Sequence, residues 1–449
     1  MDIPNVITNM TLEEKISLCA GQDFWHTKAM PQHGIPAIKM SDGPHGMRCQ
    51  EDAADMIGIN QSMPATCFPT AVTAGATWNP QLDAAEGKAI GMEGAAMGVS
   101  VVLGPGCNIK RSPLGGRNFE YISEDPYFAG HMAAAFIRGQ QEAGVSSSVK
   151  HFAVNSQEYK RQNGDSQLDQ RTYREIYLTP FEIAVKEGKP GTVMCAYNKI
   201  NGIHASDNQE LLTDILRTQW GFGGLVVTDW GALNDRMEAY KAGCDLSMPG
   251  GTVYMEKAAA EAVRSGQLEE AYVDAAVERI LRLVEKSQGI AAPKIDWDAH
   301  HALALQVAEQ GAVLLKNEGA ILPLKESDMV LIGHMAQNIR YQGSGSSHIN
   351  PTKLVSIVDA MADVPCCPCG DAQGNVSRQE LEAAAAAAKG KPVAVVVVGL
   401  PDSYESEALD RAQRLHTAHS LRIPTQNRSR PWRQSPCRRQ NEQPVVRLR

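Results

Sequence analysis

Short apolar runs alternate with longer helix-like segments through the first 288 residues of this 449-residue chain. Strands that alternate with helices pair in parallel, because each helix carries the chain back across the sheet. Over a length of roughly 250–290 residues this pattern predicts an α/β fold, a (β/α)8-type barrel, rather than two small domains. The expected strands are residues 37–40, 101–103, 148–149, 192–195, 225–227 and 244–246, and the expected helices are residues 126–143, 168–188, 211–219 and 268–288.

A carboxylate stands at the end of one of these strands. The glycine-flanked apolar run in residues 221–231 ends in Asp229, with Trp230 beside it. Barrel enzymes keep their chemistry at the carboxyl ends of the strands. An indole next to a carboxylate suits a sugar, because the ring can stack on the indole while the carboxylate attacks the anomeric carbon. The competing interpretation is an aspartate that caps the next helix.

Polar side chains also follow other predicted strands. Asp42, Lys150, His151 and Tyr197 each stand just after an apolar run. Singly, His151 fits a hydrogen-bonded core histidine and Lys150 a solvated loop end. Together they favour a site, because the carboxyl ends of barrel strands converge on one face.

A second module is expected after a linker at residues 289–300. Residues 302–315 and 380–388 have helical patterns, and residues 329–332 have a strand pattern. Residues 393–398 are entirely apolar and mostly β-branched, which is typical of a strand buried on both faces of a parallel sheet. The loop after such a strand is where open α/β sheets place functional groups. These are fewer strands and helices than a complete α/β domain needs, so the module is expected to be partial.

Composition excludes several classes of protein. No stretch approaches the roughly 18 apolar residues of a membrane span. The first residues lack the basic and apolar regions of a secretory signal, so the cytoplasm is the expected location. Cys366, Cys367 and Cys369 lack a second ligand pair at zinc spacing, and Gly343 to Ser347 lack the Gly-Lys-Ser/Thr of a phosphate-binding loop. No metal or other cofactor is therefore expected.

Charge is distributed unevenly along the chain. The formal net charge is −8, yet residues 411–449 contain ten arginines, no lysine and one acid, and so carry +9. The remaining body carries −17, which argues against a nucleic-acid-binding domain. A basic arm that binds nucleic acid is the alternative interpretation of the tail. Its abrupt change of composition instead predicts that residues 412–449 are a disordered or aberrant terminus.

Several motifs occur in an order that resembles family three of the glycoside hydrolases, specifically its β-glucosidase-like branch. The likeness covers about residues 10–411. The motifs lie at residues 41–48 (SDGPHGMR), 116–120 (GRNFE), 123–126 (SEDP), 150–155 (KHFAVN), 157–161 (QEYKR), 171–177 (RTYREIY), 194–198 (MCAYN) and 215–230, which matches the family's nucleophile signature.

The resemblance implies a barrel followed by an α/β sandwich domain at residues 301–411, partial in this chain. Asp229 matches the family's nucleophile, and Glu407 matches the acid/base in a Ser-Glu-Gly-x-Asp-Arg pattern. Ala408 replaces the glycine of that pattern, which puts the loop geometry in doubt. From spacing alone, Glu405 stays open as a rival to Glu407. The positions that match the family's contacts to the terminal sugar are Asp42, Arg48, Arg117, Lys150, His151, Arg161, Tyr197 and, as the stacking aromatic, Trp230.

The expected function is exo-acting hydrolysis of β-glucosides with retention of configuration, on small β-glucosides or oligosaccharides as partners. Retention needs two carboxyl groups about 5–5.5 Å apart, one ionised and one protonated. Cations near Asp229 are expected to keep it charged, and Glu407 is expected in a drier, less cationic place. The alternatives are a β-xylosidase or broad β-glycosidase, and a sugar-binding remnant whose incomplete second domain impairs catalysis. The oligomeric state stays open.

Overall fold

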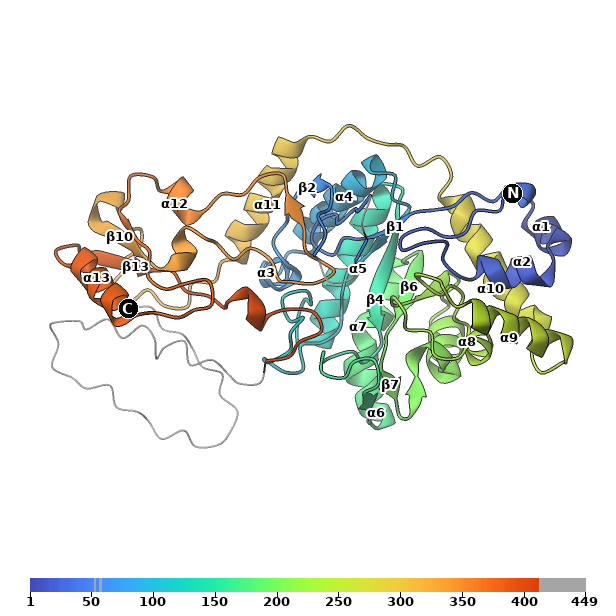
Figure 1. Cartoon of the computed structure of the whole chain (residues 1–449). Coiled ribbons are helices and arrows are strands. Elements are labelled where there is room, and N and C mark those ends of the chain that lie inside the picture. The colour runs from blue at the N-terminus through green and yellow to red at the C-terminus, as the bar shows by residue number, and fades with distance from the viewer. Residues whose placement is uncertain (52–53, 56–58, 412–449) are drawn as a thin grey trace. The chain divides into compact units, whose positions relative to one another are not determined.

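The computed structural model describes residues 1–51, 54–55 and 59–411. The prediction of a disordered or aberrant terminus concerns residues 412–449 and so lies outside the described residues. The chain forms two compact units. Among the described residues, the first contains residues 1–311, 341–353 and 403–411, and the second contains residues 312–340 and 354–402. Figure 1 shows the elements of both units along the chain.

A curled parallel sheet forms the centre of the first unit (Figure 1). Its strands pair in the order β1-β3-β4-β6-β9, all in parallel, and every strand residue is buried. Bridges from Val227 to Leu246 and from Ser247 to Ala20 continue the curl beyond β9. The fold is thus the predicted barrel type. The strands are β1 (Met40–Asp42), β3 (Val101–Leu103), β4 (Ser146–Phe152), β6 (Thr192–Cys195) and β9 (Leu225–Thr228).

Helices cover the outside of this sheet, and the four that the sequence predicts for the barrel match within two residues at each end. Residues 170–188 form one continuous helical stretch that combines α6, η2, α7 and η3. The bounds are α1 (Ile3–Asn9), α2 (Leu12–Leu18), α3 (Ala71–Ala76), α4 (Pro80–Ala96), α5 (Pro126–Glu142), α6 (Gln170–Thr172), η2 (Tyr173–Leu178), α7 (Thr179–Ile183), η3 (Ala184–Gly188), η5 (Glu210–Gln219), α8 (Arg236–Ala242), α9 (Val253–Arg264), α10 (Glu270–Lys286) and α11 (Trp297–Gly311).

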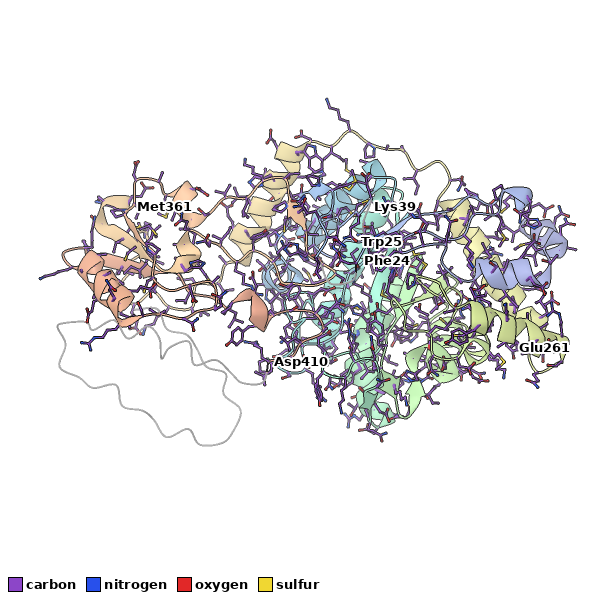
Figure 2. All side chains as sticks on the ribbon, viewed as in Figure 1. Phe24, Trp25, Lys39, Glu261, Met361 and Asp410 are labelled. Atoms are coloured by element: carbon purple, nitrogen blue, oxygen red, sulfur yellow. The ribbon has the colours of Figure 1, made fainter. Side chains whose placement is uncertain are left out.

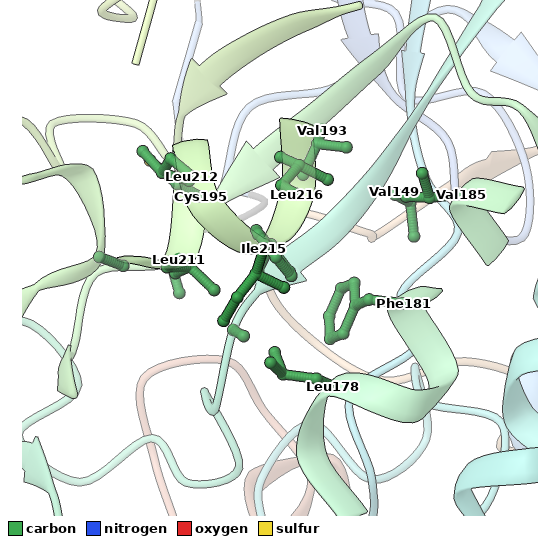
Figure 3. Close-up of a cluster of buried hydrophobic side chains, with 14 of the residues drawn as sticks. Val149, Leu178, Phe181, Val185, Val193, Cys195, Leu211, Leu212, Ile215 and Leu216 are labelled. Atoms are coloured by element: carbon green, nitrogen blue, oxygen red, sulfur yellow. The ribbon is translucent and has the colours of Figure 1, made fainter. Parts of the chain in front are cut away.

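The core of the barrel unit lies between the strands and these helices. Figure 3 shows one part of it, where side chains of β4, β6, α7 and η5 meet. Val149 and Val193 point from the sheet, and Phe181 and Ile215 from the helices, all fully buried. Burying each such side chain contributes roughly 1.5–3 kcal/mol to the free energy of folding, so these contacts stabilise the strands whose carboxyl ends carry the site.

The second unit contains a three-stranded parallel sheet in the order β12-β10-β13, with α13 packed beside it. Its β13 differs from the prediction of a strand buried on both faces. Val393 to Val396 are only half-buried, because within the described residues β13 pairs with β10 alone and forms the edge of the sheet. The elements are β10 (Met329–Ile332), α12 (Ile357–Ala360), β12 (Cys366–Cys367), α13 (Arg378–Ala388) and β13 (Val393–Val396).

The structure draws the boundary between the parts differently from the sequence analysis. The expected bounds were residues 1–288 for the barrel, 289–300 for the linker and 301–411 for the second domain. Helix α11 instead belongs to the first unit, because Val307 packs with Ala74 and Leu82, and His300 lies 2.6 Å from Glu93. Residues 341–353 and 403–411 also join the first unit.

Two small sheets lie beside the barrel strands in the first unit. One pairs β2 (Pro64–Ala65) with β11 (Asn350–Pro351). The other contains β5 (Asp165–Ser166), β7 (Lys199–Ile200) and β8 (Ile203–His204). Among the described residues, no helix combines the length and the apolar character that a membrane span needs.

Candidate active site

Most of the predicted site residues line one cavity at the carboxyl ends of the strands. Asp42 is the last residue of β1, and Lys150 and His151 lie near the end of β4. Tyr197 follows β6, and Asp229 follows β9. β4 runs further than predicted and includes Lys150 and His151, because its buried polar residues hide it from an apolar pattern. The cavity is lined by Phe24, Trp25, Asp42, Arg117, Lys150, His151, Met194, Tyr197, Asp229, Trp230, Ser346 and Glu407.

Asp229 lines this cavity, and its two carboxylate oxygens have different surroundings. Its Oδ1 accepts a hydrogen bond from the backbone N–H of Trp230 at 2.8 Å. Its Oδ2 is buried and accepts no hydrogen bond from the residues that the structure describes. Burial raises the pKa of Asp229 above its ordinary value, although Arg161 and Arg117 act to lower it. The structure therefore holds the carboxyl in place while one oxygen keeps its lone pairs available.

His151 is a titratable neighbour of Asp229. Its Nε2 lies 3.7 Å from Oδ2 of Asp229, and its Nδ1 lies 3.1 Å from the phenol oxygen of Tyr121. Asn108 fixes the backbone of His151 on both sides, at 2.7 and 2.9 Å. Burial lowers the pKa of His151 well below its ordinary value, and Arg117 and Lys150 lower it further. The imidazole is therefore neutral at pH 7 and can donate a hydrogen bond without a charge.

A buried network of charges forms another wall. Lys150 Nζ lies 3.1 Å from Asp42 and 3.5 Å from Glu120, and Arg117 forms a two-pronged pair with Glu120 at 2.7 and 2.9 Å. Burial lowers the pKa of Lys150, but Asp42 and Glu120 outweigh it, so the ammonium group keeps its proton. Such a chain of paired charges fixes each side chain in one geometry.

Arg48 is not among the residues that line this cavity, but its guanidinium donates to the carbonyl of Ser346, which does, at 3.4 Å. It is fully buried, with its guanidinium 3.8 Å from Asp42 and 3.1 Å from Asp55. The sugar contact that the resemblance implies for Arg48 stays a prediction.

Glu407 reaches the cavity from the loop at residues 403–411. Arg161 lies 2.7 Å from its Oε1, Arg117 lies 3.7 Å from the same oxygen, and the N–H of Ser346 donates to its Oε2 at 2.7 Å. Burial raises the pKa of Glu407, but Arg117 and Arg161 outweigh it and hold the pKa well below its usual range. The expectation of a less cationic place for Glu407 is therefore wrong.

The loop that carries Glu407 is anchored to the barrel unit by hydrogen bonds. Asp410 accepts from the backbone N–H groups of Gly116, Glu158 and Tyr159 at 2.8–3.0 Å. Ala408 donates its N–H to Glu158 at 2.8 Å and has a φ of 67°. That left-handed backbone favours glycine, as the family pattern suggested for this position. Glu407 lines the cavity, whereas Glu405, its rival from spacing alone, does not.

Aromatic side chains form the apolar side of the cavity. The ring of Trp230 lies 5.5 Å from that of Trp25 and 6.5 Å from that of Phe24, and its Nε1 donates to the carbonyl of Phe24 at 2.8 Å. Figure 2 labels Phe24 and Trp25 beside one another in the first unit. Tyr197 donates to the carbonyl of Trp230 at 2.8 Å, and the guanidinium of Arg161 lies 4.8 Å above its ring. These contacts fix the plane of the indole.

Sequence reasoning missed five residues of the site and its support: Phe24, Trp25, Glu120, Met194 and Ser346. Glu120 ends the GRNFE motif, and Ser346 lies in the glycine-rich segment 343–347, neither of which follows a predicted strand. Phe24 and Trp25 follow no predicted strand, so a search for residues at the carboxyl ends of strands could not identify them. Their one signal is a pair of adjacent aromatic residues in a polar, glycine-containing stretch.

The site therefore combines three carboxyl groups, those of Asp42, Asp229 and Glu407, with an indole and a set of hydrogen-bond donors in one cavity. Two carboxyl groups beside a ring-sized apolar face are the equipment of glycoside hydrolysis. Fold and site together define the class of a barrel glycoside hydrolase.

The comparison with known proteins makes this class specific. Residues 37–283 match the glycosyl hydrolase family 3 N terminal domain, and residues 312–428 match the glycosyl hydrolase family 3 C-terminal domain. The chain belongs to glycosyl hydrolase family 3.

Two curated relatives illustrate the range of the family. The thermostable beta-glucosidase B of Acetivibrio thermocellus is 48% identical over 92% of this chain and 56% of its own length. The exo-alpha-(1->6)-L-arabinopyranosidase of Bifidobacterium longum is 42% identical over 90% of this chain and 56% of its own length. The chain thus spans little more than half the length of these relatives.

Solved structures agree with the fold. The GH3 beta-glucosidase of Bifidobacterium adolescentis superposes with a TM-score of 0.84 at 41% identity, covering 90% of this chain and 59% of that one. Beta-glucosidase 3B of Thermotoga neapolitana, solved in complex with glucose, gives a TM-score of 0.82 at 32% identity, covering 93% of this chain and 64% of that one.

Proposed function

We propose that the chain carries the active site of an exo-acting, retaining β-glucosidase that removes terminal non-reducing β-D-glucosyl residues. The observation that carries the proposal is that Asp229, Glu407 and Trp230 line one cavity, while Oδ2 of Asp229 accepts no hydrogen bond from the described residues. Relatives and solved structures named as beta-glucosidases support the choice of sugar.

The proposed reaction has two steps. In the first, Oδ2 of Asp229 attacks the anomeric carbon while the bond from that carbon to the leaving oxygen breaks, and Glu407 gives its proton to that oxygen. In the second, Glu407 takes a proton from water, the water oxygen attacks the anomeric carbon, and the bond to Asp229 breaks. Two inversions restore the original configuration.

The contacts of the two carboxyl groups support this assignment of roles better than their pKa directions do. The raised pKa of Asp229 and the lowered pKa of Glu407, taken alone, would suggest the reverse roles. However, both oxygens of Glu407 are held, by Arg161 and by the N–H of Ser346, whereas Oδ2 of Asp229 accepts no hydrogen bond from the described residues. The proposal requires that hydroxyls of the bound sugar take over hydrogen bonds from Arg161. With a weaker contact to Arg161, the pKa of Glu407 then rises.

Other cavity residues are proposed to bind the sugar. Asp42 can accept hydrogen bonds from two hydroxyls, and Lys150, Arg117 and the neutral His151 can donate to others. Trp230 is proposed to stack on the ring, and its backbone carbonyl accepts a hydrogen bond from Tyr197.

Two further substrate classes have support. A β-xyloside is a β-glucoside without the hydroxymethyl group, and nothing in this set of contacts requires that group. An exo-arabinopyranosidase is 42% identical to this chain, so α-L-arabinopyranosides belong in the same test.

The test is hydrolysis of aryl β-D-glucoside, β-D-xyloside and α-L-arabinopyranoside by the purified chain and three variants. Asp229→Ala is expected to abolish turnover of every substrate. Glu407→Ala is expected to lose activity on poor leaving groups by orders of magnitude but to keep more on activated ones, which need no proton. Glu405→Ala is the matched control and should behave like the parent. Equal losses across leaving groups would refute Glu407 as the acid, and substantial activity of Asp229→Ala would refute the nucleophile.

A further inference from the structure

A buried tyrosine contacts the histidine that faces Asp229. Tyr121 directly follows the GRNFE motif and is 3% exposed. Its phenol oxygen lies 3.1 Å from Nδ1 of His151, and Nε2 of the same imidazole lies 3.7 Å from Oδ2 of Asp229. His151 is therefore the middle member of a chain of three contacts. Tyr121 is not among the residues that line the cavity, so it can act on the proposed reaction only through His151.

The partner of Nδ1 indicates which nitrogen of His151 carries the proton. A neutral imidazole has one N–H donor and one bare nitrogen that accepts. Among the described residues, Nδ1 of His151 is the only hydrogen-bond partner of the Tyr121 hydroxyl. If Nδ1 is bare, the hydroxyl donates to it and is satisfied. If Nδ1 carries the proton, the proton of the buried hydroxyl has no acceptor, which is unfavourable.

The surroundings of Nε2 lead to the same assignment. Nε2 faces a carboxylate oxygen of Asp229 that accepts no hydrogen bond from the described residues. A proton on Nε2 attracts this oxygen, whereas a bare Nε2 would present a lone pair and repel it. A separation of 3.7 Å is too long for a full hydrogen bond. The N–H therefore favours the ionised carboxylate and still leaves the lone pairs of Oδ2 available.

Neighbouring backbone holds both rings in place. Asn108 bonds to the backbone N–H and carbonyl of His151 at 2.7 and 2.9 Å, and a Cβ added at Gly106 would lie 3.1 Å from the ring of Tyr121. The two rings are nearly perpendicular, at 78°, with centroids 6.1 Å apart. Turning the imidazole over would present carbon atoms to both of its neighbours, so only the position of its proton remains to be assigned.

We propose that Tyr121 is a positioning residue, which donates to Nδ1 of His151 and so keeps the imidazole proton on Nε2, facing Asp229. This role rests on the proposed function, in which ionised Asp229 attacks the sugar. Protonated Asp229 could donate from Oδ2 to a bare Nε2, but the proton of His151 would then have to lie on Nδ1, and the Tyr121 hydroxyl would lose its acceptor. Tyr121 therefore disfavours protonation of Asp229 and opposes burial, which raises the pKa of Asp229.

Nitrogen NMR of the parent chain tests the assignment without any turnover. The histidine rings are labelled with an NMR-active nitrogen isotope, and the signals of His151 are identified by their absence in His151→Gln. A bare ring nitrogen resonates far downfield of an N–H nitrogen, and at pH 7 we expect a bare Nδ1 and a protonated Nε2. A protonated Nδ1, or protons on both nitrogens, would overturn the proposal. Because this measurement needs no substrate, absence of hydrolysis would count against the proposed function alone.

The variant Tyr121→Phe separates a positioning role from a structural one. The phenyl ring keeps the packing against Gly106, and no charge is removed, because burial raises the pKa of Tyr121 well above its ordinary value. Activity that needs ionised Asp229 is lost as the pH falls through its pKa. Without the hydroxyl that pKa rises, so the acidic limb of the kcat/KM profile for an aryl β-glucoside is expected to move up by about half to one pH unit, the equivalent of one hydrogen bond.

The groups that act directly on Asp229 are retained in this variant. They are His151, Lys150, Arg117, Arg161, Glu407, Tyr197 and Cys195. Tyr173→Phe is the matched control, because Tyr173 is also buried but its hydroxyl bonds to none of the described residues, so the limb should stay where it is. An unmoved limb in Tyr121→Phe would overturn the proposal, and so would an equal shift in Tyr173→Phe. If Tyr121→Phe does not fold, the nitrogen spectrum of the parent chain decides.

Discussion

At the scale of single residues, the charge on Glu407 is the main question that the structure raises. A group that gives a proton to a leaving oxygen must carry that proton when the bond breaks. Here two guanidinium groups favour the ionised form, with Arg161 in direct contact at 2.7 Å. Arg161 is therefore the residue through which binding of a sugar can control the acid.

Replacement of Arg161 by Met is expected to move the basic limb of the kcat/KM profile to higher pH. Activity that needs a protonated Glu407 is lost as pH rises through its pKa, and Arg161 lowers that pKa. Without the guanidinium the pKa rises, so the protonated form persists to higher pH. Hydrolysis of an aryl β-glucoside measured across pH checks this shift. The exposed Arg171→Met should leave the limb where it is, and an unmoved limb in Arg161→Met would rule out this coupling.

At the scale of elements, the loop at residues 403–411 depends on a close approach of backbone to backbone. A Cβ added at Gly116 would meet the carbonyl oxygens of Leu409 and Ser406. A Cβ at Gly345 would lie 2.4 Å from Cβ of Glu407. These two glycines thus allow the backbone of the loop to pack closely against the rest of the first unit. Ala408 has a left-handed φ of 67°, which costs about 1–2 kcal/mol in a residue with a side chain.

Gly116→Ala is expected to lower turnover about 100-fold, because displacing a catalytic group by about 1 Å costs that much. The substitution forces the loop away from Gly116 and so moves Glu407, whereas the barrel strands are untouched. Gly223→Ala is the matched control, since a Cβ there meets nothing within 4 Å and its φ is not positive. Aryl β-glucoside turnover, with the unfolding midpoint measured alongside, distinguishes the two. Equal turnover in both variants would show that the loop tolerates the displacement.

Helix α4 and strand β13 show where patterns along the sequence fail. α4 contains Gly87 and Gly91, at which an added Cβ would lie 2.4 Å from carbonyl oxygens of α5. A helix that packs this closely is buried on several faces and lacks a polar side, so no amphipathic pattern marks it. β13 has the composition of a central strand but lies at the edge of its sheet. The prediction fails because composition indicates how well side chains pack and does not indicate which strands pair.

At the scale of the whole molecule, the sequence predicts the barrel and half of the site. Asp42, Lys150, His151, Tyr197 and Asp229 could be foreseen as neighbours, because parallel strands bring their carboxyl ends to one face. Phe24 and Ser346 could not, because they reach the cavity from segments outside the strand pattern. The ionised state of Glu407 also escaped prediction, since it depends on Arg117 and Arg161, which lie far from it in sequence.

Both carboxyl groups of the proposed mechanism lie in the first unit. Asp229 belongs to residues 1–311, and Glu407 belongs to the segment 403–411 that clusters with them. The proposal therefore rests on contacts within one compact unit, such as those of Asp410 with Gly116 and Glu158.

The central claim is that Asp229 forms the covalent bond to the sugar. Incubation with a 2-deoxy-2-fluoro-β-glucoside that has an activated leaving group lets the first step proceed and slows the second, so the intermediate accumulates. Mass spectrometry of the digested protein then locates the label. The account predicts one 2-deoxy-2-fluoroglucosyl group on the peptide that contains Asp229, and none in Asp229→Ala. A label on Glu407, or no label on any carboxyl group, would contradict it.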